Sequence, residues 1–260
     1  MNKISLPEEI SVIDKKNNHY QVVIEPCYPG YGVTIGNALR RVMLSSLPGA
    51  AVTSFKIEGV QHEFDTVPHV KEDLVEIMLN LKKLRLKLFS DEPVVLNIEA
   101  KGEKVVTAKD IKKNSDVEIM NEDLVIATMT DKSAKLNMEI TVERGIGYVA
   151  VEQNDEKAKL PIGTVATDAN FSPAMNVGFN IEYVRVGEMT NYEKLIMDVL
   201  TDGTMDAREA VSQASVILRD HFSHLVNNDS TPAAVAEETV EDTEEEEEPV
   251  KKKTTKKKTK

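Results

Sequence analysis

The sequence predicts an α+β fold in which a strand-rich body carries three helices. Most apolar stretches alternate with a period of two, as half-buried strands do, and only three stretches repeat at the helical period. The strands follow one another directly instead of alternating with helices, so we expect mostly antiparallel pairing and no doubly wound parallel sheet. At 260 residues, the chain has room for one large or two modest domains.

The first elements come directly after the N-terminal segment. Alternation predicts a strand over residues 19–26, and the Pro-Gly break at 29–32 ends it. Thr34 is placed to N-cap a helix over residues 35–47, which the Pro-Gly pair after it stops.

Two further helices and a series of strands are expected downstream. Apolar residues recur at helical spacing from Val70 to Leu81. Asp206 and Glu209 form a capping box for a last helix that reaches about Leu225. Residues 151–160 are polar, and we expect them to be mobile. The other alternating stretches predict strands near 51–57, 84–88, 94–98, 124–129, 134–142, 179–183 and 195–199.

The charge balance limits the kinds of partner. With 44 acidic and 32 basic residues, the net charge is −12, so the chain should not coat DNA or an anionic membrane through bulk electrostatics. From Thr231 onward the sequence has few large apolar residues, with nine acidic and seven basic ones, and it should be disordered. A solubilising tail is the favoured interpretation, and phosphate contact by its lysines is the alternative.

The composition also points to a compartment. Cys27 is the only cysteine, which excludes a disulfide framework and a four-thiolate zinc site. No uncharged apolar run reaches the ~18–20 residues that span a bilayer, and the first ten residues lack the apolar region of a signal peptide. These features predict a cytoplasmic protein.

The first predicted helix carries one apolar residue on its polar face. Most of its apolar residues share a wide face that should be buried, but Leu44 falls almost opposite. Arg40, Arg41 and Asn37 surround this leucine, a composition typical of a small protein-contact patch. A simply exposed leucine is the other interpretation, and the pattern alone does not separate the two.

The last helix carries a continuous apolar stripe. Alanines in its first half and larger residues in its second half would let another helix approach closely. The stripe can pack inside its own chain or against a second copy, and both interpretations remain open at this point. Its members are Ala210, Val211, Ala214, Ile217, Leu218, Phe222 and Leu225.

Patterns that would indicate catalysis are weak. The Gly30–Gly36 loop precedes a helix, where phosphate can bind, but its spacing matches neither the dinucleotide fingerprint nor a Walker loop, so turn formation is favoured. His221 and His224 have a spacing that can chelate metal, although His221 lies within the apolar stripe. No Asp-x-Asp-x-Asp triplet for two-metal nucleotidyl transfer is present in the sequence.

One long segment resembles a known family. The sequence Tyr31-Gly-Val-Thr-Ile-Gly-Asn-Ala-Leu-Arg-Arg-Val-Met-Leu-Ser-Ser-Leu-Pro-Gly49 strongly resembles the signature of the bacterial RNA polymerase α subunits. Collinear matches continue to about residue 225, which makes the resemblance far more specific than a single motif. They include Ile57-Glu-Gly-Val-Gln-His-Glu-Phe64, Leu79-Asn-Leu-Lys82, Val142-Glu-Arg-Gly-Ile-Gly-Tyr148, Pro161-Ile-Gly163, Thr167-Asp-Ala-Asn-Phe-Ser-Pro173 and Thr201-Asp-Gly-Thr204.

The resemblance implies a division that the linear pattern does not give. Residues 1–49 and 168–228 would form a discontinuous dimerisation subdomain, and residues 50–167 a strand-rich insert subdomain. Residues 229–260 would form the acidic and lysine-rich tail. The first and last helices would then meet at a two-fold dimer interface, which favours self-association for the stripe.

The resemblance also implies subunit contacts. Contact with the β subunit would involve Asn37, Arg40, Arg41 and Leu44, and contact with β′ would involve Lys82, Thr167 and Asp168. The dimer interface would comprise Ile35, Leu39, Val42, Ala210, Ala214, Ile217, Leu218, His221, Phe222 and Leu225.

The implied function is assembly. A homodimer would recruit β and then β′ for DNA-templated transcription, alongside the ω and σ subunits, as part of a nucleotidyltransferase complex associated with the nucleoid. No catalytic or cofactor-binding residue is expected in this chain, and Mg²⁺ is expected on the catalytic subunit.

One departure from the family concerns DNA contact. Family members usually continue into a second, DNA-binding domain, and here the chain continues only into the tail. Direct DNA contact would therefore be small. It would fall to the lysines of the tail, namely Lys251, Lys252, Lys253, Lys256, Lys257 and Lys258, with Lys260 beyond them.

Overall fold

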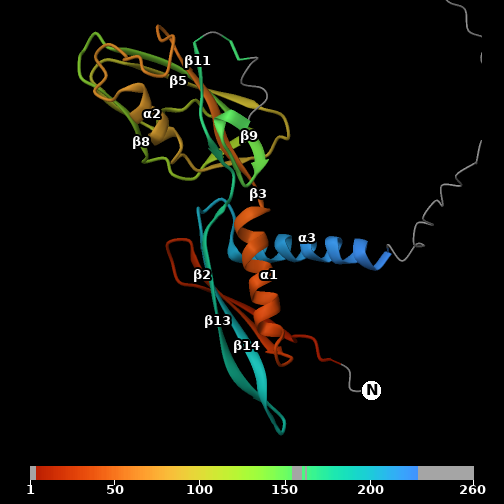
Figure 1. The fold of residues 1–260 in the computed structure, drawn as a ribbon. Coiled ribbons are helices and arrows are strands. Elements are labelled where there is room, and N and C mark those ends of the chain that lie inside the picture. The colour runs from red at the N-terminus through yellow and green to blue at the C-terminus, as the bar shows by residue number, and fades with distance from the viewer. Residues whose placement is uncertain (1–3, 154–159, 162, 228–260) are drawn as a thin grey trace, which may run out of the picture.

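The computed structural model describes residues 4–153, 160, 161 and 163–227, and it contains two sheets that each support a hydrophobic core (Figure 1). The predicted tail at 229–260, with its lysines, and most of the segment predicted to be mobile at 151–160 lie outside the described residues.

The first sheet joins the two ends of the chain. Its four antiparallel strands stand in the order β1-β2-β14-β13, so a strand from the N-terminal part pairs with one that follows it by more than 160 residues. Two helices pack on this sheet and on each other, α1 directly above β13 and β14, and α3 beside β2. The bounds are β1 Glu9–Asp14, β2 His19–Cys27, α1 Tyr31–Ser45, β13 Ala174–Val186, β14 Met189–Thr201 and α3 Ala207–Asn227.

The second sheet is built from the middle of the chain. Its order is β5-β9-β3-β4-β7, and β11 pairs with β3. The two-stranded β6–β8 sheet and α2 complete the larger of the two cores. The bounds are β3 Pro48–Ile57, α2 Leu74–Leu81, β4 Leu86–Leu88, β5 Val94–Lys101, β6 Lys104–Thr107, β7 Val117–Ile119, β8 Val125–Met129, β9 Lys135–Ile146 and β11 Thr164–Ala166.

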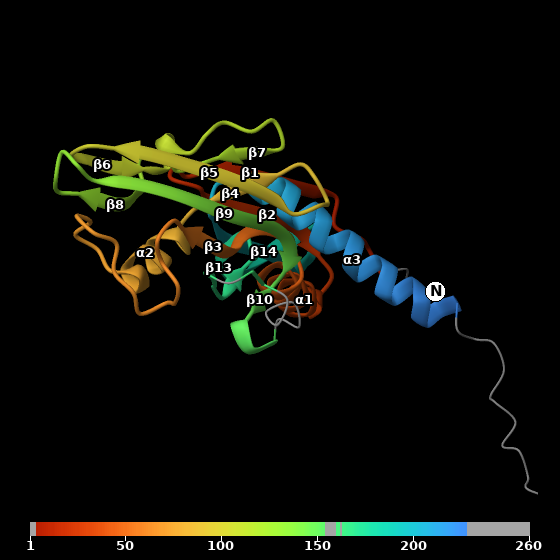
Figure 2. The same ribbon diagram turned by 90° about the horizontal axis from the view of Figure 1, so that it is seen from above.

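A small third cluster joins the two sheets. The short strands β10 (Tyr148–Val149) and β12 (Ala169–Asn170) pair with each other, and the buried Phe171 packs with Ala51 and Ala169 beside them. Across the same junction, the Arg85 guanidinium donates a hydrogen bond of 3.0 Å to the carbonyl oxygen of Asp202. Seen from above, α3 extends outward from this junction, away from the strands of the second sheet (Figure 2).

The α+β class is confirmed, and two predicted helix starts are wrong. α1 begins at Tyr31 after a left-handed Gly30, a full turn before the Thr34 cap that the sequence predicted. α2 begins at Leu74, because the Asp73 side chain caps it by accepting a hydrogen bond from the Glu76 amide at 2.7 Å. Val70, expected in that helix, instead forms a β-bridge with Met129. The capping role of Asp206 is confirmed, since its carboxylate accepts from the Glu209 amide at 2.7 Å.

Alternation predicted most of the strands in the two large sheets. β2, β3, β5, β8, β9, β13 and β14 fall where alternating apolar residues predicted them, with longer bounds for most. The edge strand β1 and the short strands β6 and β7 were not predicted. Across the described residues, no helix is long and apolar enough to cross a lipid bilayer.

Candidate protein-contact site

The outer α1 face, defined here as Asn37, Arg40, Arg41 and Leu44, is open to solvent. All four residues are exposed, and Leu44 keeps 36% of its surface accessible. The opposite side of the helix buries Leu39 and Met43 in the first core. The helical period therefore predicted correctly which face of α1 turns outward.

Both arginines of this face are available to a partner. Neither Arg40 nor Arg41 forms an ion pair with any residue that the structure describes. The C-terminal end of α1 is held by a tertiary contact, since the Ser172 hydroxyl donates a hydrogen bond of 3.2 Å to the carbonyl oxygen of Leu44. A rigid apolar residue between two unpaired cations suits a protein surface that offers an apolar side chain and carboxylates.

The glycine-rich loop before α1 binds a carboxylate of its own chain. The backbone amides of Gly30 and Gly32 donate hydrogen bonds of 2.9 and 2.8 Å to the two carboxylate oxygens of the buried Glu193, on β14. Glu193 thus occupies the position at the helix N-terminus where an anion would bind. This geometry supports the turn interpretation of the loop against phosphate binding.

The predicted dimer-interface residues divide into a buried and an exposed group. Leu39, Ala210 and Ala214 are each less than 5% exposed inside the core of their own chain. These three side chains therefore pack within their own chain, and their place in a dimer interface stays a prediction. Ile35, Val42, Ile217 and Leu218 are half-buried at the rim of the same core, and His221, Phe222 and Leu225 are exposed.

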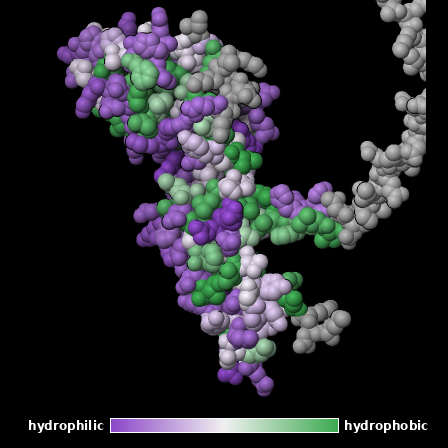
Figure 3. All heavy atoms as spheres, in the orientation of Figure 1, coloured by the Kyte–Doolittle hydropathy of each residue, from purple (hydrophilic) through white to green (hydrophobic). Residues whose placement is uncertain are grey.

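The exposed group lies on the α3 arm, residues 216–226, which protrudes from the body (Figure 1). Phe222, Leu225 and Val226 are 60%, 68% and 70% exposed, and Val216 is 42% exposed. Figure 3 shows hydrophobic side chains along this protruding helix. So much exposed apolar surface on one helix marks a protein-contact site.

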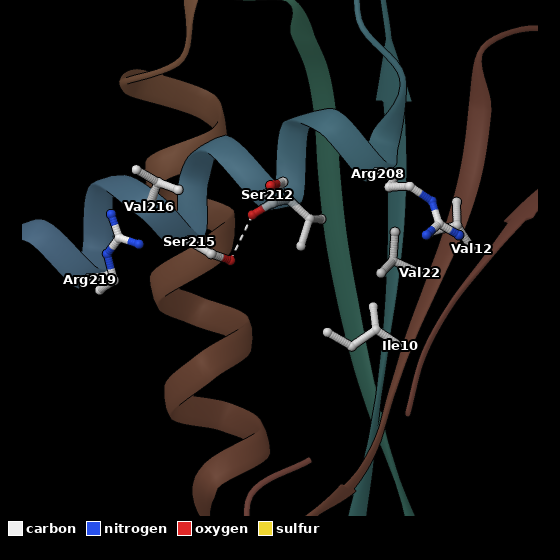
Figure 4. A pocket seen from close by; sticks show the side chains of 9 residues that line it. Ile10, Val12, Val22, Arg208, Ser212, Ser215, Val216 and Arg219 are labelled. Carbon is white, nitrogen blue, oxygen red and sulfur yellow. Dashed lines mark hydrogen bonds between the residues drawn. The ribbon is translucent and has the colours of Figure 1, made fainter. Parts of the chain in front are cut away.

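A mostly apolar groove of about 510 Å³ runs between β1, β2 and the root of the same helix (Figure 4). Ile10, Val12 and Val22 line its strand side, and Val211 and Val216 line its helix side. The polar lining residues include Ser215, whose hydroxyl donates to the Val211 carbonyl at 2.7 Å. The Ser215 hydroxyl is therefore already hydrogen-bonded within its own helix.

The residues predicted to contact β′ form a cluster of their own. The Lys82 ammonium donates to an Asp168 carboxylate oxygen at 2.7 Å, and the Val151 amide donates to the other oxygen at 3.0 Å. These bonds, first that from Lys82, lower the pKa of Asp168 to about 2. Thr167 is buried, and its hydroxyl is bonded only weakly, at 3.4 Å, to the Asp168 carbonyl.

The depressed pKa gives a testable pH dependence. A folded-state pKa near 2 lies below the ordinary ~3.9, so the stabilisation is fully present above pH ~4 and is lost as the pH falls through about 2. We expect Asp168→Asn to lower the free energy of unfolding by about 1–2 kcal/mol at pH 7, since partial exposure screens the pair. In urea titrations, the gap in free energy of unfolding between Asp168→Asn and the unchanged chain should be smaller at pH 3 than at pH 7. An equal gap at both pH values would show that the ion pair is not its source.

The histidines give no support to a metal site. His221 and His224 lie on the α3 arm, and no group of three or more His, Cys, Asp or Glu side chains gathers anywhere among the described residues. Sequence reasoning missed Glu193, the exposed Ile146 and Tyr148 beside α1, and Val216 and Val226 of the arm. For Ile146 and Tyr148, the spacing of two residues could have indicated that both side chains lie on the same face of an extended segment.

Comparison with known proteins defines first a class. The family described as "RNA polymerase Rpb3/RpoA insert domain" matches residues 55–172, a span that runs from the end of β3 to just beyond β12 and includes the other strands of the second sheet. The chain therefore carries the insert domain that RNA polymerase subunits of this class share.

Curated relatives define the family. The chain is 50% identical over 219 residues to the DNA-directed RNA polymerase subunit alpha of Symbiobacterium thermophilum, covering 84% of this chain and 69% of that protein. It is 53% identical to the subunits of the same name from Carboxydothermus hydrogenoformans and Moorella thermoacetica, covering 82% of this chain and 68% and 67% of those proteins. The chain belongs to the family of bacterial DNA-directed RNA polymerase α subunits. The resemblance predicted from the sequence is confirmed, and with it the α-subunit role in transcription within a nucleotidyltransferase complex. Membership of this family implies assembly with other polymerase subunits.

Proposed function

We propose that this chain forms a homodimer and that the dimer assembles the polymerase by recruiting the β subunit and then β′. The outer α1 face is the site proposed for β, and the Lys82–Asp168 cluster is proposed to lie near β′. The observation that carries the proposal is Leu44, held exposed between two unpaired arginines on a rigid helix.

The α3 arm supports the homodimer. It presents Phe222, Leu225 and Val226 to solvent, and the same chain carries an apolar groove along the root of that helix. In an isologous dimer each contact occurs twice, so a chain that carries both a projecting and a receiving surface can pair with a second copy of itself. The arm of one copy is proposed to cover the groove of the other.

The proposed role needs no catalytic group in this chain. Nucleotidyl transfer uses Mg²⁺ held by several carboxylates, and the described residues offer no group of three potential ligands. We place the Mg²⁺ site on another chain of the complex, and we expect the main contacts to DNA to be made by other chains too. The complex is proposed to act in the bacterial cytoplasm. The ω and σ subunits would join the same assembly.

The outer α1 face can be tested by alanine substitution. Arg41→Ala and Leu44→Ala should each weaken capture of purified β by about ten-fold or more, because each removes a central contact of the proposed interface. Both variants should remain dimeric in sedimentation velocity, since both side chains point away from the core.

Arg185→Ala is the matched control, because Arg185 is an exposed arginine at the far end of β13. It should capture β as the unchanged chain does. Undiminished capture by Arg41→Ala and Leu44→Ala would refute the proposed β site, and a monomeric variant would show that the face assignment is wrong.

A further inference from the structure

Two exposed apolar side chains of the insert flank a single glycine at the end of α1. Ile146 ends β9 and Tyr148 begins β10, and they are 58% and 60% exposed. A Cβ built on Gly147, between them, would lie 3.2 Å from the carbonyl oxygen of Ser45, the last residue of α1. Leu44 is the neighbour of Ser45, so the exposed Leu44 and the exposed Ile146 and Tyr148 belong to adjoining segments of α1 and the insert. Figure 2 shows β10 beside α1.

This segment is held in place from both sides. Phe171 donates its backbone amide to the Gly147 carbonyl at 2.8 Å, and its ring packs so closely on Gly145 that a Cβ there would lie 2.6 Å from a ring carbon. The Asp168 carboxylate near the Tyr148 hydroxyl raises the pKa of that tyrosine. A rigid aromatic side chain loses little entropy on binding, which favours it as an anchor.

The charges around the segment indicate the chemistry of the partner. Arg40 and Arg41 lie on the α1 side without an ion pair among the described residues, while Lys82 is already paired with Asp168 on the insert side. The free positive charge therefore sits at the α1 end, next to Leu44. A chain that placed carboxylates against these arginines would bring its neighbouring apolar residues over Ile146 and Tyr148.

We propose that Ile146 and Tyr148 extend the β-binding site, so that one β subunit contacts both α1 and the insert. The inference rests on the proposed recruitment of β by the outer α1 face. It adds that the site spans both sheets of the chain, and β binding would then fix how the insert sits on the dimerising part.

Binding of purified β to the full chain, measured by biolayer interferometry, tests the extension. Ile146→Glu and Tyr148→Ala should each weaken binding at least ten-fold, and both should keep the unchanged sedimentation coefficient of the dimer. Val105→Glu is the control, since Val105 is 49% exposed on β6, at the far end of the insert. It should bind β as the unchanged chain does.

The outcomes separate this inference from the proposed function. If Arg41→Ala loses β while Ile146→Glu and Tyr148→Ala retain it, the extension is wrong and recruitment through α1 stands. If the unchanged chain fails to bind β, the proposed recruitment of β and its extension to the insert are both wrong. Should Ile146→Glu unfold, hydrogen exchange on the unchanged chain decides the matter. Protection of amides 144–150 on adding β supports the extension, and unchanged exchange there overturns it.

Discussion

Phe222→Glu is expected to leave the chain monomeric. In the single chain Phe222 is 60% exposed, so the substitution should cost the fold little, but in the proposed dimer its ring would be covered by the second copy. Burying an unpaired carboxylate costs several kcal/mol, and two-fold symmetry imposes the cost twice. Sedimentation velocity at micromolar concentration should show the mass of one chain, with a circular dichroism spectrum that matches the unchanged protein.

Phe64→Glu is the matched control for this experiment. Phe64 is 77% exposed in the loop between β3 and α2, outside the proposed dimer interface, so the same change of side chain should leave the dimer intact. A Phe222→Glu protein that sediments as a dimer would remove the α3 arm from the interface.

Gly49→Ala should destabilise the fold by about 3 kcal/mol or more. A Cβ at this position would lie 1.9 Å from the carbonyl oxygen of Phe171, and a backbone atom cannot rotate away as a side chain would. The clash is relieved only by moving β3 or the Phe171 segment, which join the two sheets. Overpacking of this kind costs typically 1–3 kcal/mol, and more when backbone must shift. The midpoint of urea unfolding measures the loss.

Gly178→Ala provides the comparison, because Gly178 also lies in a strand and a Cβ there would meet nothing within 4 Å. Its free energy of unfolding should change by no more than about 0.5 kcal/mol. Equal midpoints for the two variants would show that the close approach at Gly49 does not constrain the junction.

Local periodicity predicted much of the fold and the direction of the outer α1 face. The period of 3.6 depends on neighbours three and four residues apart, so Leu44 could be placed outward from the sequence alone. The start of α1 could not be predicted in this way. The amides of Gly30 and Gly32 at this helix start donate hydrogen bonds to Glu193, which is distant in the sequence. The residues near Thr34 give no sign of that bond.

The apolar stripe of α3 shows a second limit. Its spacing says which residues share a face but not where the strands of the same chain stop covering that face. Ala214 is fully buried, whereas Phe222, two turns further on, is 60% exposed. Likewise the strand pattern at 135–146 does not reveal that Ile146 emerges beside α1, because that proximity depends on the Phe171 junction.

The bond between Glu193 and the start of α1 has a consequence for biosynthesis. When the ribosome has produced the first 170 residues, β2 has β1 as its only neighbour, and α1 lacks the carboxylate that caps it. The strands of the insert, from β3 to β11, have all been translated by then. The N-terminal helix is thus among the earliest segments made, but its cap and its sheet are complete only after β14 has been translated.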